Sequence, residues 1–316
     1  MILLNTKTVG KTSKRRKNGT FRDNAELLML TLPGLIYFFI FQYLPMGGLV
    51  LAFKRYTYRG GMFGSPWVGF KNFELFFKSG DMVRIIRNTM GYSMIFLVVG
   101  TVVNLFVALM LYEVTKRILI KAYQTLMILP NFISWVLVSF ITYIFLHPEY
   151  GVLNSIITAC GGKGISWYSD TTWWPVILTV VHIWKSVGIG CLYYYAALLG
   201  IDKSLYEAAD IDGATKLQKI FNISLPSIAP IIAINIIMGT GSFFRGDFGL
   251  FYQIPRDVGA LYPVTDIIDT YVYRGIRTGD IGATSAIGFI QSFVGLVMVC
   301  LSNMVVRKID EENSMF

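Results

Sequence analysis

Histidine, cysteine and charge are all scarce in this chain, and the first two shortages exclude classes of site. The 316 residues include two histidines and three cysteines. Cys160, Cys191 and Cys300 are odd in number and widely spaced, which argues against a disulfide framework and against a set of metal ligands. No cluster of Cys, Asp or Glu accompanies His147 or His182 at metal spacing. We therefore expect structural roles for both histidines and no metal site.

Catalytic and nucleotide-binding motifs are missing as well. The sequence has no H-E-x-x-H, no G-x-S-x-G and no pair of acids inside one apolar run that could act as acid and base. NTKTVGKTS near the N-terminus is close to a phosphate-binding loop, but Asn5 replaces the first glycine and too few residues precede it for a strand. We expect that the chain is not an enzyme and binds no cofactor.

Long apolar runs are what the sequence has in abundance. Hydrophobic residues make up 54% of the chain and charged residues 15%, which is more apolar than is typical of water-soluble proteins. MGYSMIFLVVGTVVNLFVALMLY is continuous rather than alternating, which favours a helix in lipid over a barrel strand. The sequence predicts an all-α, polytopic membrane protein with six transmembrane helices, at residues 26–53, 89–112, 121–146, 173–199, 226–245 and 281–306.

These runs form one domain between two short polar ends. We expect a basic cytoplasmic N-terminal segment at 1–25, a single six-span transmembrane domain at 26–308 and a cytoplasmic C-terminal tail at 309–316. Basic residues at span ends are attracted to anionic lipid head groups. The net charge of +9 therefore predicts contact with the lipid bilayer of the cell membrane, plasma or inner, and no nucleic acid.

The short loops predict the orientation of the spans. The 113–120 loop carries Lys116 and Arg117, whereas the base of the 147–170 loop is Lys163 alone. The positive-inside rule therefore places the first loop and both termini in the cytoplasm. The 54–88 segment is rich in bases and would lie outside, so this bias is partial.

A polar stretch at 200–225 interrupts the apolar pattern on the cytoplasmic side. Asp202 is a good N-cap for a short helix, and Asp212-Gly213 offers a corner. We expect a second short helix at 214–221, ended by Ser224-Leu225-Pro226. The residues alone leave two interpretations open, a docking surface for a partner or a solvated amphipathic loop.

The same stretch resembles a family motif. The string E-A-A-x-x-D-G-A followed by I-x-L-P is similar to the EAA loop in the membrane subunits of ABC-type importers. The similarity extends to PWVGFKNFELFF, WKSVG and DIIDTYVYRG, which resemble permeases for complex oligosaccharides in the carbohydrate branch. The residues that carry the motif are Glu207, Ala208, Ala209, Asp210, Asp212, Gly213, Ala214, Leu225 and Pro226.

The resemblance implies the fold of a type I ABC importer permease and a division of labour. In this family the EAA helix couples the permease to a cytoplasmic ATPase. By carry-over, Glu207 would pair with a base, Ala208 and Ala209 would allow close seating, and Gly213 would form the corner. The expected partners are a second permease subunit, two ATPase subunits that use ATP and Mg²⁺, an extracellular sugar-binding protein and an oligosaccharide substrate.

The sugar pathway is predicted from polar and aromatic residues within the spans. A charge in a span is costly and normally faces the protein interior or a wet cavity, so Lys185 is the first candidate. It could instead pair with an acid on the second permease. Weaker candidates, which could equally serve helix packing, are Asn104, Asn131, Trp135, Tyr193, Tyr194, Asn235, Phe243, Phe244 and Gln291.

Charged residues also gather near the outer ends of the last two spans. Arg245, Asp247, Arg256 and Arg274 could form an outer gate, contact the binding protein or favour an acidic sugar, while a solvated loop is an equal alternative.

Two other functional classes stay open. An ion-coupled secondary transporter would use acids within its spans, and the acids here lie almost wholly outside them. A membrane-embedded sugar or lipid transferase would need a catalytic constellation, and we find none in the sequence.

Overall fold

The computed structural model describes residues 25–309, and all of its regular elements are helices. Within this range the backbone forms one isolated bridge, between Lys54 and Trp67, and no strand. Most of the predicted segment 1–25 and of the tail 309–316 lies outside the described residues. The backbone divides into two compact units, residues 1–49 and 50–316, which are described separately.

The described part of the first unit is one apolar helical run. α1 (Ala25–Phe38) contains Pro33 and continues through the π-helical turn η1 (Phe39–Tyr43) into the 3₁₀ helix η2 (Leu44–Phe53), which crosses the unit boundary. Residues 28–53 are long and apolar enough to cross a membrane, as predicted for the first span.

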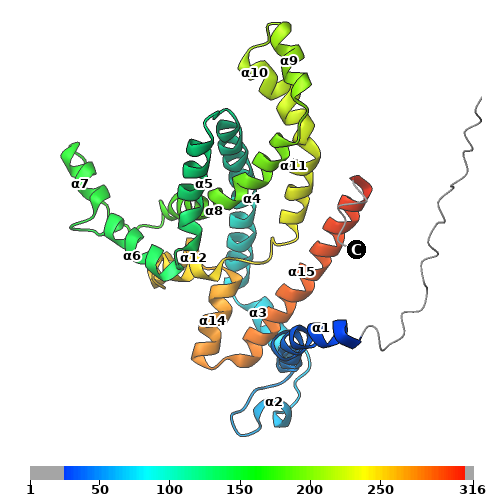
Figure 1. Cartoon of the computed structure of the whole chain (residues 1–316). Coiled ribbons are helices and arrows are strands. Elements are labelled where there is room, and N and C mark those ends of the chain that lie inside the picture. The colour runs from blue at the N-terminus through cyan, green and yellow to red at the C-terminus, as the bar shows by residue number, and fades with distance from the viewer. Residues whose placement is uncertain (1–24, 310–316) are drawn as a thin grey trace, which may run out of the picture. The chain divides into compact units, whose positions relative to one another are not determined.

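The second unit contains four further uninterrupted candidate spans. These are α4 (Asp81–Tyr112), α8 (Trp174–Leu199), the continuous helix at 216–240 that includes α11 (Leu225–Thr240), and α15 (Ile281–Ile309). α4 packs along α8, and α11 packs against both α15 and α8 (Figure 1). Five helices can thus span a membrane, or six when the bent pair described next counts as one, so the predicted all-α class is confirmed.

The third predicted span, 121–146, is not one straight helix. It consists of α5 (Arg117–Phe132) and α6 (Trp135–Leu146), which meet at an angle of 98°. Pro130 lacks an N–H and disturbs the last turn of α5. Ser134 then starts a new helix, because its side chain accepts a hydrogen bond from the Leu137 N–H at 3.3 Å. The third predicted span is therefore broken into two helices, which together can still count as one span.

The cytoplasmic loop also differs from its prediction at one end. α9 (Lys203–Ile211) forms as expected, but α10 (Lys216–Lys219) does not stop before Pro226. It passes through a π-helical turn, η3 (Ile220–Ser224), into α11, because the Leu225 N–H donates to the Ile220 carbonyl five residues back. The expected stop at 224–226 is therefore wrong, and the fifth span is continuous with the loop.

Short helices lie between the spans. At the end of the unit away from α9 and α10, Figure 1 places α3 (Lys71–Lys78) and α14 (Ile268–Thr278). The remaining short helices are α2 (Gly61–Gly64), α7 (Val152–Ala159), α12 (Phe248–Gln253), η4 (Gly259–Leu261) and α13 (Tyr262–Thr265).

A buried carboxylate ties this end of the unit together. The side chain of Asp266 has no exposed surface, and it forms ion pairs with Arg274 on α14 at 2.5 Å and with Arg84 on α4 at 3.3 Å. Thr270 also donates a hydrogen bond to it at 2.8 Å. A buried charge is tolerated only when it is paired in this way, so the network fixes α14 against the start of α4.

We predict that Asp266→Asn lowers the free energy of unfolding by about 3 kcal/mol, because it leaves two arginines without their buried partner. Asp81→Asn is the matched control, since Asp81 pairs with the same Arg84 at 2.8 Å but is 41% exposed. The control should cost less than about 1 kcal/mol. Thermal unfolding of both variants in detergent measures the difference, and equal losses would contradict the assignment.

Candidate functional site

The EAA stretch forms a helix, a glycine corner and a second helix. The Asp202 carboxylate caps α9 by accepting a hydrogen bond from the Ser204 N–H at 2.9 Å, and the hydrogen bonds from Ser204 hold the pKa of Asp202 below its usual value. At the other end Gly213 has a φ of +73°, in the left-handed region that favours glycine. The helix and the corner predicted from the sequence are both confirmed.

The corner has the hydrogen bonds of a Schellman motif. The Ala214 N–H donates to the Ala209 carbonyl at 2.9 Å, and the Gly213 N–H donates to the Asp210 carbonyl at 3.2 Å. These two bonds satisfy carbonyls that the end of α9 would leave unpaired. Ala209, Asp210, Gly213 and Ala214 of the motif therefore have a local structural role, because their backbone groups form the turn that ends α9.

Side-chain contacts hold the second helix in place. Thr215 and Gln218 form a capping box at the start of α10, in which each side chain accepts from the other residue's backbone N–H. Lys219 pairs with Asp210 across the corner, and Lys216 pairs with Glu113, just after the end of α4, at 2.8 Å. The loop is thus fixed both internally and to α4.

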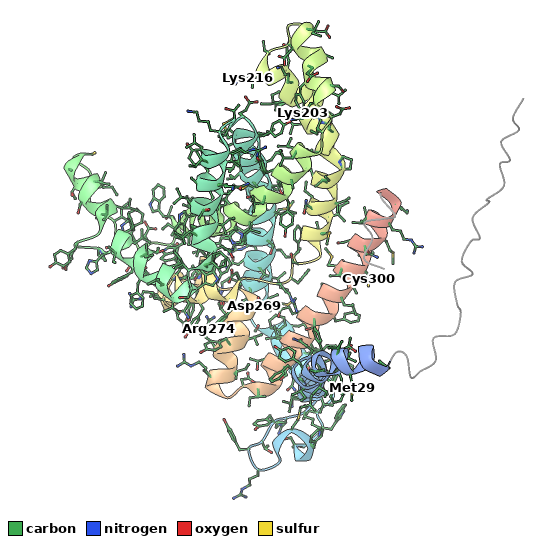
Figure 2. All side chains as sticks on the ribbon, viewed as in Figure 1. Met29, Lys203, Lys216, Asp269, Arg274 and Cys300 are labelled. Atoms are coloured by element: carbon green, nitrogen blue, oxygen red, sulfur yellow. The ribbon has the colours of Figure 1, made fainter. Side chains whose placement is uncertain are left out.

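The tip of this loop presents an unusual surface. Ile211 is 88% exposed and Leu217 is 66% exposed, beside the exposed Glu207 and Ala208. Figure 2 shows Lys203 and Lys216 at this tip, at the end of the unit away from Arg274. The tip combines apolar side chains with charges, a small residue and a fixed backbone, which suits contact with another protein. Leu225 and Pro226 do not belong to the tip, since they lie within the helix that leads away from it.

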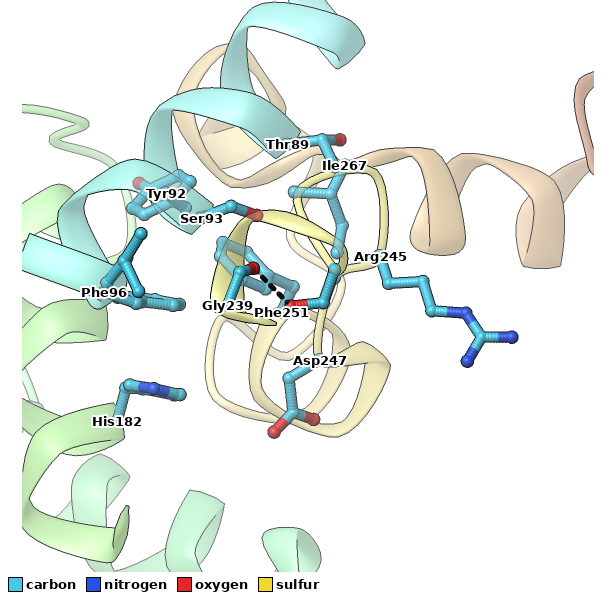
Figure 3. Close-up of a pocket in the computed structure, with 13 residues that line it drawn as sticks. Thr89, Tyr92, Ser93, Phe96, His182, Gly239, Arg245, Asp247, Phe251 and Ile267 are labelled. Carbon is cyan, nitrogen blue, oxygen red and sulfur yellow. Dashed lines mark hydrogen bonds between the residues drawn. The ribbon is translucent and has the colours of Figure 1, made fainter. Parts of the chain in front are cut away.

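Two adjoining cavities lie along α4 and α8. Each has a volume of about 380 Å³. The first, called the Asp247 cavity, is drawn in Figure 3 and is lined by Thr89, Tyr92, Ser93, Phe96, Leu97, His182, Gly239, Ser242, Arg245, Gly246, Asp247, Phe251 and Ile267. The second, called the Asn131 cavity, is lined by Phe96, Leu97, Gly100, Thr101, Asn104, Asn131, His182, Ser186, Ile189, Gly190, Tyr193, Tyr194 and Asn235.

The Asn131 cavity brings together part of the predicted pathway. Asn131, Tyr193, Tyr194 and Asn235 all line it, although they come from three different helices, and so does Asn104. The Asn131 side chain is half-buried. Asn235 donates to the Ile231 carbonyl of its own helix at 3.0 Å, which leaves its amide oxygen as an acceptor.

Lys185 has a different environment from the one predicted for a pathway residue. Its ammonium group donates to the carbonyls of Pro130, Asn131 and Ile133, at 3.1, 2.8 and 2.5 Å. These carbonyls lie at and just beyond the end of α5, where the chain bends. The ammonium also lies 5.1 Å from the centre of the Trp135 ring. All three N–H donors are thus used by the backbone, and the residue lines neither cavity.

The other predicted pathway residues make hydrogen bonds or packing contacts within the unit. The Phe243 carbonyl accepts from Ser93, and Gln291 donates to the Phe244 carbonyl at 2.7 Å and to Asp269 at 3.2 Å. The Trp135 ring packs so closely on Gly249 that a methyl group there would overlap it. Trp135, Phe243, Phe244 and Gln291 line neither cavity.

The charged residues predicted near the outer ends divide into two pairs. Arg274 is engaged within the unit, by Asp266, by Asp257 at 3.3 Å and by the Tyr262 ring at 4.0 Å, and Arg256 stacks on Tyr143 at 4.2 Å. Asp247 caps α12 by accepting from the Leu250 N–H at 3.2 Å, and it lines the cavity that bears its name. Arg245 lines the same cavity, and its guanidinium extends away from the other labelled side chains (Figure 3).

Phe96 and His182 were missed as site residues by the sequence analysis. Both line both cavities, and their rings stack at 3.9 Å with an angle of 7° between planes. His182 offered a weak signal, as a lone histidine in an apolar run, while Phe96 offered none among the many aromatic residues of the spans.

We predict that Lys185→Met loosens the bend between α5 and α6. Losing three hydrogen bonds from a charged donor should cost about 3 kcal/mol locally, so amides of residues 127–138 should exchange with deuterium roughly 100-fold faster. Lys163→Met, at an exposed lysine in a loop, is the matched control and should leave these rates unchanged. Equal exchange in the two variants would refute the capping role.

Comparisons with known proteins agree with the resemblance in the sequence. A family model described as "binding-protein-dependent transport system inner membrane component" matches residues 97–311. Among curated proteins, LplB of Bacillus subtilis (strain 168) is 37% identical over 90% of each chain. The polygalacturonan/rhamnogalacturonan transport system permease protein YteP of the same strain is 34% identical, over 90% of this chain and 89% of that protein.

Solved structures match as well. A chain from the crystal structure of a bacterial ABC transporter involved in the import of the acidic polysaccharide alginate has a TM-score of 0.82 and 34% identity, over 92% of this chain and 98% of that one. A second crystal structure, of a bacterial alginate ABC transporter with an alginate pentasaccharide-bound periplasmic protein, gives a TM-score of 0.81 and 33% identity, over 92% and 96% of the two chains.

Proposed function

We propose that this chain forms half of the translocation pathway of an ATP-driven saccharide importer. The chain belongs to the family of binding-protein-dependent transport system inner membrane components. The predicted resemblance to ABC importer permeases and the predicted fold are confirmed by the family match and the structural neighbours. The alternatives of a secondary transporter and of a membrane transferase are not carried further, because the matching family is one of binding-protein-dependent transport components and YteP is named a transport system permease.

One observation carries the coupling role, the fixed geometry of the loop between α8 and α11. Its two short helices are capped, joined by a Schellman corner and tied by Lys216 to Glu113, while Glu207 and the apolar tip are exposed. α10 continues into α11 without a stop. A force applied at the tip would therefore reach the span through a continuous helix, which is what coupling to a separate motor requires.

The proposed partners follow from this arrangement. A cytoplasmic ATPase, which would use ATP and Mg²⁺, would seat on the tip, with a base near Glu207. Two such subunits, a second permease and an extracellular sugar-binding protein would complete the importer. This assignment requires both termini to be cytoplasmic, as the short basic loop predicts. It also explains why a chain that does no chemistry itself could take part in ATP-driven transport.

The proposed substrate is an oligosaccharide. Support comes from the relatives, since one is named for polygalacturonan and rhamnogalacturonan and the structural neighbours are described as alginate transporters. The cavities offer amide and hydroxyl groups, which suit sugar hydroxyls, and Arg245 offers a guanidinium that could pair with a sugar carboxylate. The names of these relatives favour an acidic oligosaccharide over a neutral one.

We predict that Gly213→Pro releases the ATPase from the complex. Proline cannot adopt the positive φ of Gly213, so the corner and the seating of α9 should be lost. Gly161→Pro is the matched control, because Gly161 has a similar φ of +82° in a different loop. The measurement is a gentle-detergent pull-down of the tagged protein from its native membrane, in which the co-purifying chains are identified.

Wild type and Gly161→Pro should bring down a second permease and an ATPase, and Gly213→Pro should retain the permease alone. Retention of the ATPase by Gly213→Pro at the wild-type level would remove the coupling role from this loop. Absence of any ATPase from the wild-type complex would contradict the proposed function itself.

A further inference from the structure

The segment between the first two candidate spans carries an inference that goes beyond the proposed function. It comprises residues 54–80, with α2 and α3, and Figure 1 places both helices at the end of the unit away from α9 and α10. We propose that this segment is a docking surface for the anionic head groups of the lipid bilayer on that side of the membrane.

α3 has two sides of different chemistry. Asn72, Phe73 and Phe76 share one side of the helix and are buried, and this side packs against α15. The Asn72 amide donates to the Ala52 carbonyl at 2.8 Å, which also ties α3 to the end of η2. The other side of α3 is therefore fixed in an outward direction, and Phe77 lies on it.

The loop that leads to α3 is held in a defined shape. The Lys54 ammonium donates to the Phe63 carbonyl at 2.5 Å, and Lys54 also forms the backbone bridge with Trp67. The Trp67 ring stacks on Phe53, with 5.6 Å between ring centres and 8° between planes. The side chains that this loop exposes therefore have fixed positions.

Aromatic side chains dominate what the segment exposes. Phe63, Trp67, Phe70 and Phe77 are 79%, 63%, 74% and 55% exposed. Together with the exposed bases Arg55, Arg59, Lys71 and Lys78 they make up the aromatic–basic surface. Large apolar side chains gathered on a fixed backbone mark a contact surface, and a mixture of aromatic rings and bases is typical of segments that lie at a membrane interface.

The connections of the segment fix its level relative to the bilayer. It is joined directly to a candidate span at each end, at Phe53 and at Asp81, so its residues stay close to the membrane surface. Apart from the short α2, residues 54–70 form irregular backbone, which is not stable in the hydrocarbon core because no water is there to pair its polar groups. The boundary between hydrocarbon and water is the level that suits it, and aromatic residues are enriched there.

The charges of the segment specify the kind of head group. Residues 54–80 include five bases and one acid, Glu74, which pairs with Lys78. The aromatic–basic surface therefore has an excess of positive charge, which attracts anionic lipids. Lysine is depleted in contacts between proteins, which favours a lipid partner over a protein. The contact also explains why so many bases lie on a side that the positive-inside rule does not favour.

Quenching by labelled lipids tests whether the surface touches the bilayer. Phe77→Cys, in a variant that lacks Cys160, Cys191 and Cys300, places one fluorophore on the exposed side of α3, and Lys203→Cys places it on α9 as the control. The full chain, with the chains that co-purify with it, is put in nanodiscs whose lipids carry a nitroxide near the head-group end of the acyl chain. Quenching at residue 77 should exceed that at residue 203 about 3-fold or more.

The preference for anionic lipid is measured with the same fluorophore at residue 77. The nitroxide is carried in turn on phosphatidylglycerol and on phosphatidylcholine, in nanodiscs of otherwise identical composition. Phosphatidylglycerol should quench about 3-fold more strongly, and Arg59→Gln with Lys71→Gln should lower this ratio by about half or more. Lys163→Gln with Lys203→Gln, at exposed lysines outside the surface, is the matched control and should leave the ratio unchanged.

Three results would overturn the proposal. Equal quenching at residues 77 and 203 would exclude contact with the bilayer, and equal quenching by the two lipids would exclude a preference for anionic head groups. If residue 77 is shielded from the nitroxide and crosslinks to a co-purifying chain, the surface is a protein interface instead. None of these results bears on the coupling loop, so the proposed function stands or falls separately, on the pull-down of Gly213→Pro.

Discussion

The structure depends on one interaction, the contact of the Lys185 ammonium with three backbone carbonyls at the end of α5. In a bilayer no water is present to satisfy a carbonyl that a helix leaves unpaired, so an interrupted span is stable only where other groups replace the lost hydrogen bonds. Lys185 does this with all three of its donors. Its positive charge also interacts favourably with the partial negative charge at the C-terminus of α5. The 98° bend and the placement of Asn131 both follow from this contact.

Close packing between helices completes the arrangement. Gly188 lies one turn after Lys185 on α8, and a methyl group there would overlap the Met127 carbonyl of α5. Gly190 likewise leaves no space beside the Asn104 side chain of α4. Small residues of this kind let helices approach closely in a membrane. The WKSVG stretch thus supplies two contacts with α5. Lys185 donates to the carbonyls at its end, and Gly188 lets α8 approach its backbone closely.

The sequence predicted those features that depend on local chemistry. Apolar runs located the spans, and Asp202 and Gly213 located the ends of α9, because capping and a left-handed corner need particular residue types. The bend near Pro130 was missed, since proline is tolerated within membrane helices when neighbouring groups satisfy the backbone, and here that group is 55 residues away. The stacked Phe96 and His182 were missed for the same reason, because their pairing depends on how α4 and α8 pack.

The proposed import function requires the Asn131 cavity to face opposite sides of the membrane before and after the proposed ATPase partner binds ATP. Ser186 lines that cavity and is half-buried, so Ser186→Cys in a variant that lacks Cys160, Cys191 and Cys300 places a single reactive thiol there. Labelling by a membrane-impermeant maleimide would be measured from each side of the membrane, with and without trapped ATP. The account predicts that the side from which the thiol reacts changes when ATP is trapped. Reaction from the same side in both states, in an intact complex, would contradict it.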